Sequence, residues 1–141
     1  MIGIHLKTSI RVLALLLCIF MAPVFSRELV LVASSQSSIE SVDKQTLIDL
    51  YLGRQLTQRL RVGDIISAPY RALFYERLTG RDIRQVESLW AQRLFTAEGV
   101  PPEMFRKFES AMEWIQEEPD RVLYLDIKEL TDDLKVIHEL R

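Results

Sequence analysis

Cysteine, histidine and glycine are scarce in this 141-residue chain, and their scarcity excludes much common catalytic chemistry. The one cysteine, Cys18, lies in an apolar N-terminal segment, so the rest of the chain has neither disulfide nor thiol chemistry. A serine triad or a zinc site would depend on His138, three residues from the C-terminus in a segment expected to fray. The later glycines are isolated from one another, which excludes a phosphate-binding P-loop and a dinucleotide fingerprint. We therefore predict a protein that is not an enzyme and that uses no metal and no cofactor.

Long apolar runs are also absent, apart from fourteen uncharged residues at Val12–Phe25. Basic residues precede this run and the small residue Ser26 follows it, which is the layout of a secretory signal peptide. The run is shorter than the roughly 18 to 20 residues that a membrane-spanning helix needs. We predict a signal peptide at residues 1–26 and one exported domain at 27–141, located in the bacterial periplasm without stable membrane insertion. A retained N-terminal anchor is the alternative.

Charge is distributed unevenly over the predicted domain. It has 16 basic and 20 acidic residues, yet residues 54–84 contain seven arginines and three acids, while residues 85–141 contain seven basic and thirteen acidic residues. Two interpretations stay open: a solvated mixed surface, or an arginine-rich face for an anion or an acidic partner. Export, net acidity and the absence of a recognisable binding module argue against nucleic acid as a partner.

Apolar segments with strand character alternate with helical patterns. The predicted strands are 28–33, a segment at Ile65–Ile66 that follows a turn at Val62–Asp64 and ends at Pro69, 122–125, and 134–137. The predicted helices run from Ser41 or Asp43 to Gly53, from Pro69 to Gly80, from Asp82 to the break at Ala97–Gly99, and from Pro101 to Pro119. Strands separated by helices in about 115 residues predict an α/β fold, a short mixed sheet flanked by helices.

The predicted helices have residues typical of helix ends and of buried faces. Asp82 and Gln85 have the spacing of a capping box, and Gly53 and Gly80 stand where left-handed residues end helices. The apolar face of the helix after Asp82 consists of Ile83, Val86, Trp90 and Leu94. The face of the last helix consists of Met104, Phe108, Ala111, Met112 and Ile115. We expect both faces to lie in the core.

A helix N-terminus in the basic segment is the candidate binding site. The segment from Ser67 to Arg71 connects a strand to the helix that carries Phe74. Free N–H groups and the helix dipole favour an anion at such a position. We therefore assign Ser67, Tyr70 and Arg71 as candidate anion-binding residues.

A set of motifs in a fixed order extends over about residues 29–126. They are Ser41, Leu47, Leu50–Gly53, Arg71, Phe74, Leu89–Trp90, Phe95, Pro101–Pro102, Pro119 and Val122–Leu125. In this order and spacing they resemble the second lobe of the phosphate-binding proteins of ABC transporters, and especially the short, exported, single-lobe proteins grouped with them. The resemblance implies one lobe of a type 2 periplasmic binding protein and a non-catalytic role with phosphate or another oxyanion. Its implied partners are an ABC transporter component or another envelope protein.

The phosphate site of that family is altered at the matching positions. The family's Ser-Gly-Thr loop corresponds to Ala68, Pro69 and Tyr70, and the arginine before it corresponds to Asp64. Each lost charge-assisted hydrogen bond is worth about 1.5 to 3 kcal/mol, so we expect a weakened or lost phosphate site. The second lobe that would close a cleft is missing as well. The alternative function is a periplasmic interaction or regulatory module that kept the fold without binding a ligand.

Overall fold

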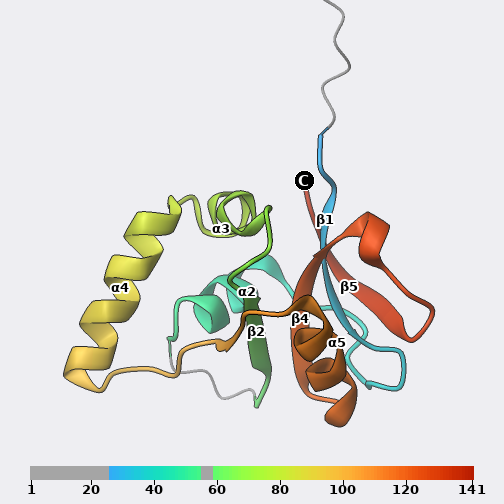
Figure 1. Cartoon of the computed structure of the whole chain (residues 1–141). Helices are drawn as coiled ribbons and strands as arrows, with labels where there is room; N and C mark the ends of the chain where they lie inside the picture. The colour runs from blue at the N-terminus through green and yellow to red at the C-terminus, as the bar shows by residue number, and fades with distance from the viewer. Residues whose placement is uncertain (1–25, 55–58) are drawn as a thin grey trace, which may run out of the picture.

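The computed structural model describes residues 26–54 and 59–141 (Figure 1). The predicted signal peptide at residues 1–26 therefore lies outside the described residues, except for Ser26. Among the helices in the described part of the chain, none has the length and apolar character needed to cross a membrane.

A mixed sheet of five strands, in the order β3-β2-β4-β1-β5, forms the centre of the fold. Its strands are β1 (Leu29–Ser34), β2 (Arg61–Ile65), β3 (Glu103–Phe105), β4 (Arg121–Asp126) and β5 (Leu134–Leu140). Strand β2 pairs in parallel with β3 and β4, whereas β1 pairs antiparallel with β4 and β5. This arrangement confirms the predicted α/β class with a short mixed sheet.

Helices cover both faces of the sheet. They are α2 (Lys44–Tyr51), α3 (Arg71–Thr79), α4 (Ile83–Thr96) and α5 (Phe108–Glu117), with a 3-10 turn, η2, at Ile127–Glu129. Helices α2 and α3 share one core with the sheet, and α5 forms a second core on the opposite face. Helix α4 lies beside α3 at the outer end of the molecule and away from the sheet (Figure 1). Only Val86 of α4 is buried.

Helix ends follow the local signals closely. The side chain of Asp43 accepts a hydrogen bond from the Thr46 N–H at 3.0 Å, and hydrogen bonds from Thr46 lower the pKa of this carboxyl. Asp82 and Gln85 form the predicted capping box. Gly53 and Gly80 both adopt a left-handed φ of +69° just past their helices.

The predicted helix from Pro101 is wrong over its first third. Residues Glu103–Phe105 form strand β3, which pairs in parallel with Gly63–Ile65, and α5 begins only at Phe108. Proline favours extended backbone in the residue before it and supplies no N–H of its own, so Pro101–Pro102 suits the approach to a strand. As a result Met104 is 62% exposed instead of lying in the core.

The expected turn at Val62–Asp64 is also wrong, because these residues form the middle of β2. Gly63 is required there by packing, since a Cβ atom on it would lie 2.8 Å from Leu123 Cδ1. Helix α3 begins at Arg71, two residues later than predicted.

The C-terminal strand is longer than predicted and ends at Leu140. His138 therefore lies within β5, where its Nδ1 is 3.0 Å from the carbonyl oxygen of Val42. The expectation of a frayed end at this histidine is wrong.

Candidate functional site

In the loop between β2 and α3, residues 66–70, two backbone N–H groups, those of Ile66 and Ala68, are already hydrogen-bonded within the protein. The Ala68 N–H donates to the Ile65 carbonyl at 3.0 Å, and the Arg71 N–H donates to the Ala68 carbonyl at 3.1 Å. Pro69 has no N–H to offer. These turns leave few backbone donors for an anion in front of α3.

The three predicted anion-binding side chains do not converge. Ser67 is exposed and makes no hydrogen bond within the described part of the chain. Tyr70 is buried, and its hydroxyl donates to the carboxylate of Glu129 on the far side of the loop. Arg71 points in another direction, towards Asp64 on β2.

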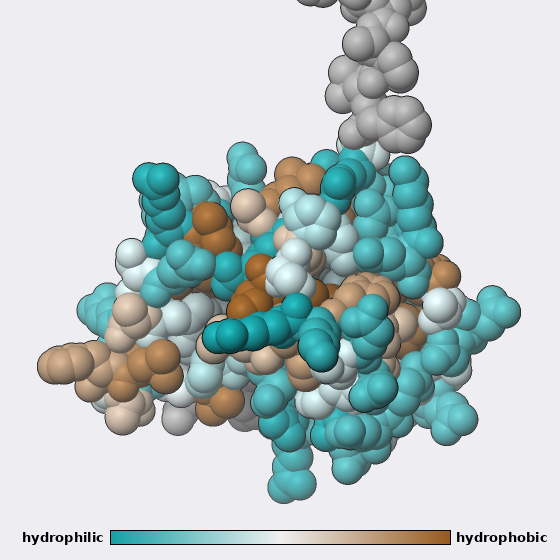
Figure 2. Space-filling model, in the orientation of Figure 1, coloured by the Kyte–Doolittle hydropathy of each residue, from teal (hydrophilic) through white to brown (hydrophobic). Residues whose placement is uncertain are grey.

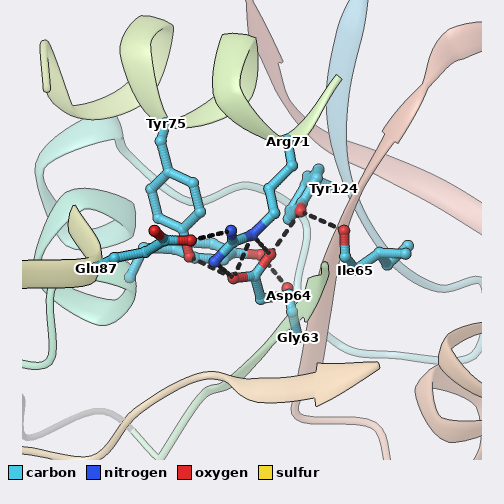
Figure 3. A network of polar contacts seen from close by, with 8 residues as sticks. Gly63, Asp64, Ile65, Arg71, Tyr75, Glu87 and Tyr124 are labelled. Atoms are coloured by element: carbon cyan, nitrogen blue, oxygen red, sulfur yellow. Dashed lines mark hydrogen bonds and ion pairs between the residues drawn. The ribbon is translucent and has the colours of Figure 1, made fainter. Parts of the chain in front are cut away.

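Asp64 is the centre of a buried polar network (Figure 3). It is 2% exposed. Arg71 donates to its carboxylate from Nε at 3.0 Å and from Nη2 at 2.9 Å. The hydroxyls of Tyr75 and Tyr124 donate to it at 3.0 and 2.7 Å. The carboxylate therefore accepts hydrogen bonds from a guanidinium and two phenols, a donor set that suits an oxyanion.

Arg71 bridges this network to helix α4. Its Nη1 donates to the Glu87 carboxylate at 2.9 Å, so all three guanidinium nitrogens have acceptors within the protein. The Arg71 side chain is 15% exposed. Burial opposes its charge, but the hydrogen bonds and attraction from Asp64 prevail and raise the pKa of Arg71.

The tyrosines of the network are held as neutral donors. Burial, followed by the negative charge of Asp64, raises the pKa of Tyr124 far above its usual range. Burial and Asp64 raise the pKa of Tyr75 in the same way. Both hydroxyls therefore keep their protons at neutral pH.

Aromatic packing fixes these hydroxyls in place. The ring of Phe74 stacks on that of Tyr124 with centroids 3.7 Å apart. The Tyr51 ring meets Phe74 edge-on, and its hydroxyl donates to the Gly63 carbonyl at 3.0 Å. The network is thus built on β2, β4 and three helices, α2, α3 and α4.

Sequence reasoning singled out Arg71 and the substitution at Asp64, but it missed Tyr75, Tyr124 and Glu87. The spacing of Arg71 and Tyr75, one helical turn apart, was an available signal that both side chains share a face. The contacts of Asp64 with Tyr124 and of Arg71 with Glu87 join elements distant in sequence. No local pattern predicts them.

A hollow of about 500 Å³ opens beside this network. Asp64, Arg71 and Glu87 form its polar part. Its apolar lining consists of Ile66, Trp90, Ala91, Leu94, Pro101, Pro102 and Met104. An apolar hollow of this size with a few convergent polar groups is typical of a binding site. We call it the apolar hollow.

The seven arginines of residues 54–84 do not form one continuous face. Arg71 points inward, and Arg81 and Arg84 line a shallow depression along α4. Arg54, Arg59 and Arg61 line a separate hollow. Within the described residues, no group of three or more histidine, cysteine or carboxylate side chains is placed to hold a metal ion.

No protein-family model matches this chain, and no curated protein matches its sequence. Solved structures do match its fold. One is an ABC-type phosphate transport receptor from Vibrio cholerae, with a TM-score of 0.57 and 12% identity over 79% of this chain and 47% of the receptor. Another is a putative phosphate ABC transporter substrate-binding protein with bound phosphate from Clostridium perfringens, with a TM-score of 0.58, 11% identity, and coverage of 79% of this chain and 45% of that protein.

These matches confirm the predicted fold, that of one lobe of a phosphate-binding protein. The chain spans about half the length of the two proteins. One is described as a phosphate transport receptor and the other as a substrate-binding protein, and the likeness at this level of identity concerns the fold.

Proposed function

We propose that this chain is an exported, non-catalytic domain of the solute-binding type whose phosphate site is lost. The observation that carries the proposal is the Asp64 network. The donors that would hold an oxyanion, the Arg71 guanidinium and the hydroxyls of Tyr75 and Tyr124, are occupied by the protein's own carboxylate.

Electrostatics supports the same conclusion. A phosphate in front of α3 would approach the negative charge of Asp64 without gaining Arg71, which is already paired with two carboxylates. Desolvating an anion there without new donors costs several kcal/mol. The residual candidate donors are the Ser67 hydroxyl and the remaining N–H groups of the loop, which face solvent instead of a closed cleft.

Isothermal titration with phosphate, sulfate and arsenate at low salt tests this proposal. We expect no heat and no shift of the melting temperature at millimolar concentrations of each anion. Saturable binding of phosphate by the wild type would contradict the lost site. The Ser67→Ala variant then shows whether such binding occurs at the predicted loop, because only that site uses the Ser67 hydroxyl.

Export to the periplasm is part of the proposal and rests on the signal-peptide pattern of residues 1–26. The mass of the protein recovered from cells tests it, since cleavage after Ser26 gives an N-terminus at Arg27. An association with an ABC transporter component stays a proposal drawn from the fold.

A second candidate function is that of a protein-interaction module. The observation that favours it is a group of exposed apolar side chains around the end of α4 and the segment that follows it. Leu94 and Met104, which line the apolar hollow, are each 62% exposed, and Val100 is 79% exposed. Exposed apolar groups that are close together mark interaction surfaces more often than isolated ones do.

A further inference from the structure

The apolar side chains lie where α4 stands away from the edge of the sheet. Figure 2 shows apolar surface over the outer end of the molecule, where α4 ends. Strand β3 is an edge strand, and Met104 pairs with Asp64 in its register, so both side chains project from the same face of the sheet. On that face the apolar hollow separates Met104 from Trp90 and Leu94 of α4.

A second hollow lies on the other side of the same segment. We call it the arginine hollow; its charged lining residues are Arg54, Arg59, Arg61 and Glu103. It shares Pro101, Pro102 and Met104 with the apolar hollow. The two hollows therefore form one surface on either side of the segment 100–104.

The arginine hollow has an excess of positive charge. Arg54 pairs with Asp49 at 2.8 Å, and Arg61 lies 3.5 Å from Glu103. Arg59 is exposed and has no ion pair with any residue that the structure describes. Guanidinium groups bind carboxylates in bidentate geometry, so this exposed cluster of arginines favours an acidic partner.

The edge of β3 offers a bound segment fewer main-chain hydrogen bonds than an ordinary free strand edge does. The strand has three residues, and the two prolines before it cannot donate a main-chain hydrogen bond. A bound segment would therefore gain affinity mainly from an apolar side chain in the hollow and from carboxylates on the arginines.

We propose that the two hollows together bind an acidic segment of another protein. A large apolar side chain of that segment occupies the apolar hollow, and its carboxylates contact Arg54, Arg59 and Arg61. This inference rests on the second candidate function, that of an interaction module, and is independent of the lost phosphate site.

Selection of a phage library of random dodecapeptides against the protein tests this inference. We expect enriched peptides to carry net negative charge and at least one large apolar residue. The affinity of one enriched peptide, measured by fluorescence anisotropy, should fall about tenfold or more in Arg59→Glu and in Leu94→Ser. It should also weaken with rising salt.

Two matched variants control for charge and hydrophobicity. Arg84→Glu makes the same charge change as Arg59→Glu, but on α4 and outside both hollows. Phe95→Ser removes an exposed apolar side chain that lines neither hollow. Both should change the affinity less than about twofold.

The inference is overturned if no peptide is enriched or if enriched peptides show no acidic bias. The same holds if Arg59→Glu and Leu94→Ser weaken binding no more than the controls Arg84→Glu and Phe95→Ser do. It is also overturned if the wild type forms a dimer that Leu94→Ser dissociates, because the occupant is then a second copy. If a peptide binds the wild type and Arg59→Glu equally, the inference about these hollows is overturned, while the second candidate function, an interaction module, is not contradicted. The phosphate titration is unaffected by any of these outcomes.

Discussion

At the scale of single residues, Asp64 organises the buried polar network. In the resembling family an arginine is expected at this position, and here a buried carboxylate takes its place. The Arg71 guanidinium is the partner of this carboxylate, to which it donates from Nε and Nη2. In this chain the carboxylate takes up the neighbouring donors, the Arg71 guanidinium and the hydroxyls of Tyr75 and Tyr124.

Replacing Asp64 with asparagine tests how far the fold depends on this carboxylate. We expect Asp64→Asn to lower the free energy of unfolding by about 3 to 5 kcal/mol, because the largely buried Arg71 charge keeps only the exposed Glu87 as a charged partner. Urea denaturation measures the change. The control is Glu87→Gln, whose side chain is 58% exposed and whose loss should cost less than about 1 kcal/mol. Equal losses in the two variants would show that Asp64 is not the main partner of Arg71.

At the scale of elements, α4 depends on contacts with the turn that follows α2. The side chain of Arg93 donates to the Gly53 carbonyl at 2.9 Å, and the Trp90 ring lies against Gly53 itself. Gly99, at a φ of +77°, brings the end of the α4 loop next to the same carbonyl. These contacts hold α4 at a distance from β3 and so keep the apolar hollow open.

Two glycine variants separate this packing from backbone strain. Gly53 and Gly80 share a φ of +69°, but a Cβ atom at Gly53 would lie 2.1 Å from the Trp90 ring, whereas one at Gly80 meets nothing within 4 Å. Gly80→Ala should lower the free energy of unfolding by about 1 kcal/mol, because alanine is strained in this left-handed backbone conformation. Gly53→Ala should cost a further 1 to 3 kcal/mol or so, because Trp90 must shift.

Urea denaturation gives both free energies of unfolding, and hydrogen exchange of the α4 amides locates the effect. Faster exchange in α4 is expected for Gly53→Ala only. Equal stability of the two variants would mean that Trp90 moves at no cost and does not anchor α4.

At the scale of the whole molecule, one lobe carries two cores that share a sheet. The core on the α3 face holds the tyrosines, and the core on the α5 face holds Trp114 and aliphatic side chains. Both matching structures are about twice as long as this chain. On the α3 face, the aromatic side chains of Tyr51, Phe74, Tyr75 and Tyr124 are buried within one of these cores.

The buried tyrosines predict alkaline sensitivity of the whole fold. Burial raises the pKa of Tyr51, Tyr75 and Tyr124 in the native state, while the unfolded chain titrates near pH 10. Their contribution to stability is complete below about pH 10 and is lost as the pH rises further, because the unfolded state then releases protons that the native state keeps.

The free energy of unfolding should therefore fall above pH 10 by about 1.4 kcal/mol per pH unit for each such tyrosine. Urea denaturation between pH 8 and 11 measures the slope. In Tyr124→Phe the fall per pH unit should be smaller by about 1.4 kcal/mol, the contribution of one tyrosine. An unchanged slope would mean that Tyr124 ionises in the native state.

The sequence was sufficient where short-range chemistry decides the outcome. The caps at Asp43 and Asp82 and the left-handed glycines after α2 and α3 follow from hydrogen bonds and backbone sterics within a few residues. Strand β3 did not follow in this way, because Glu103–Phe105 becomes a strand only by pairing with β2, about forty positions earlier in the chain. The partial exposure of the α4 face likewise depends on how far α4 stands from the sheet.

The sequence by itself thus determined the α/β class and most helices and strands, and it singled out Arg71 and Asp64. Only the tertiary structure showed that Asp64 occupies the donors of Arg71, Tyr75 and Tyr124, and that a hollow lies between α4 and β3. The physical reason is that hydrogen-bond saturation and surface shape depend on side chains from several elements. Their meeting is decided by packing and not by any local pattern.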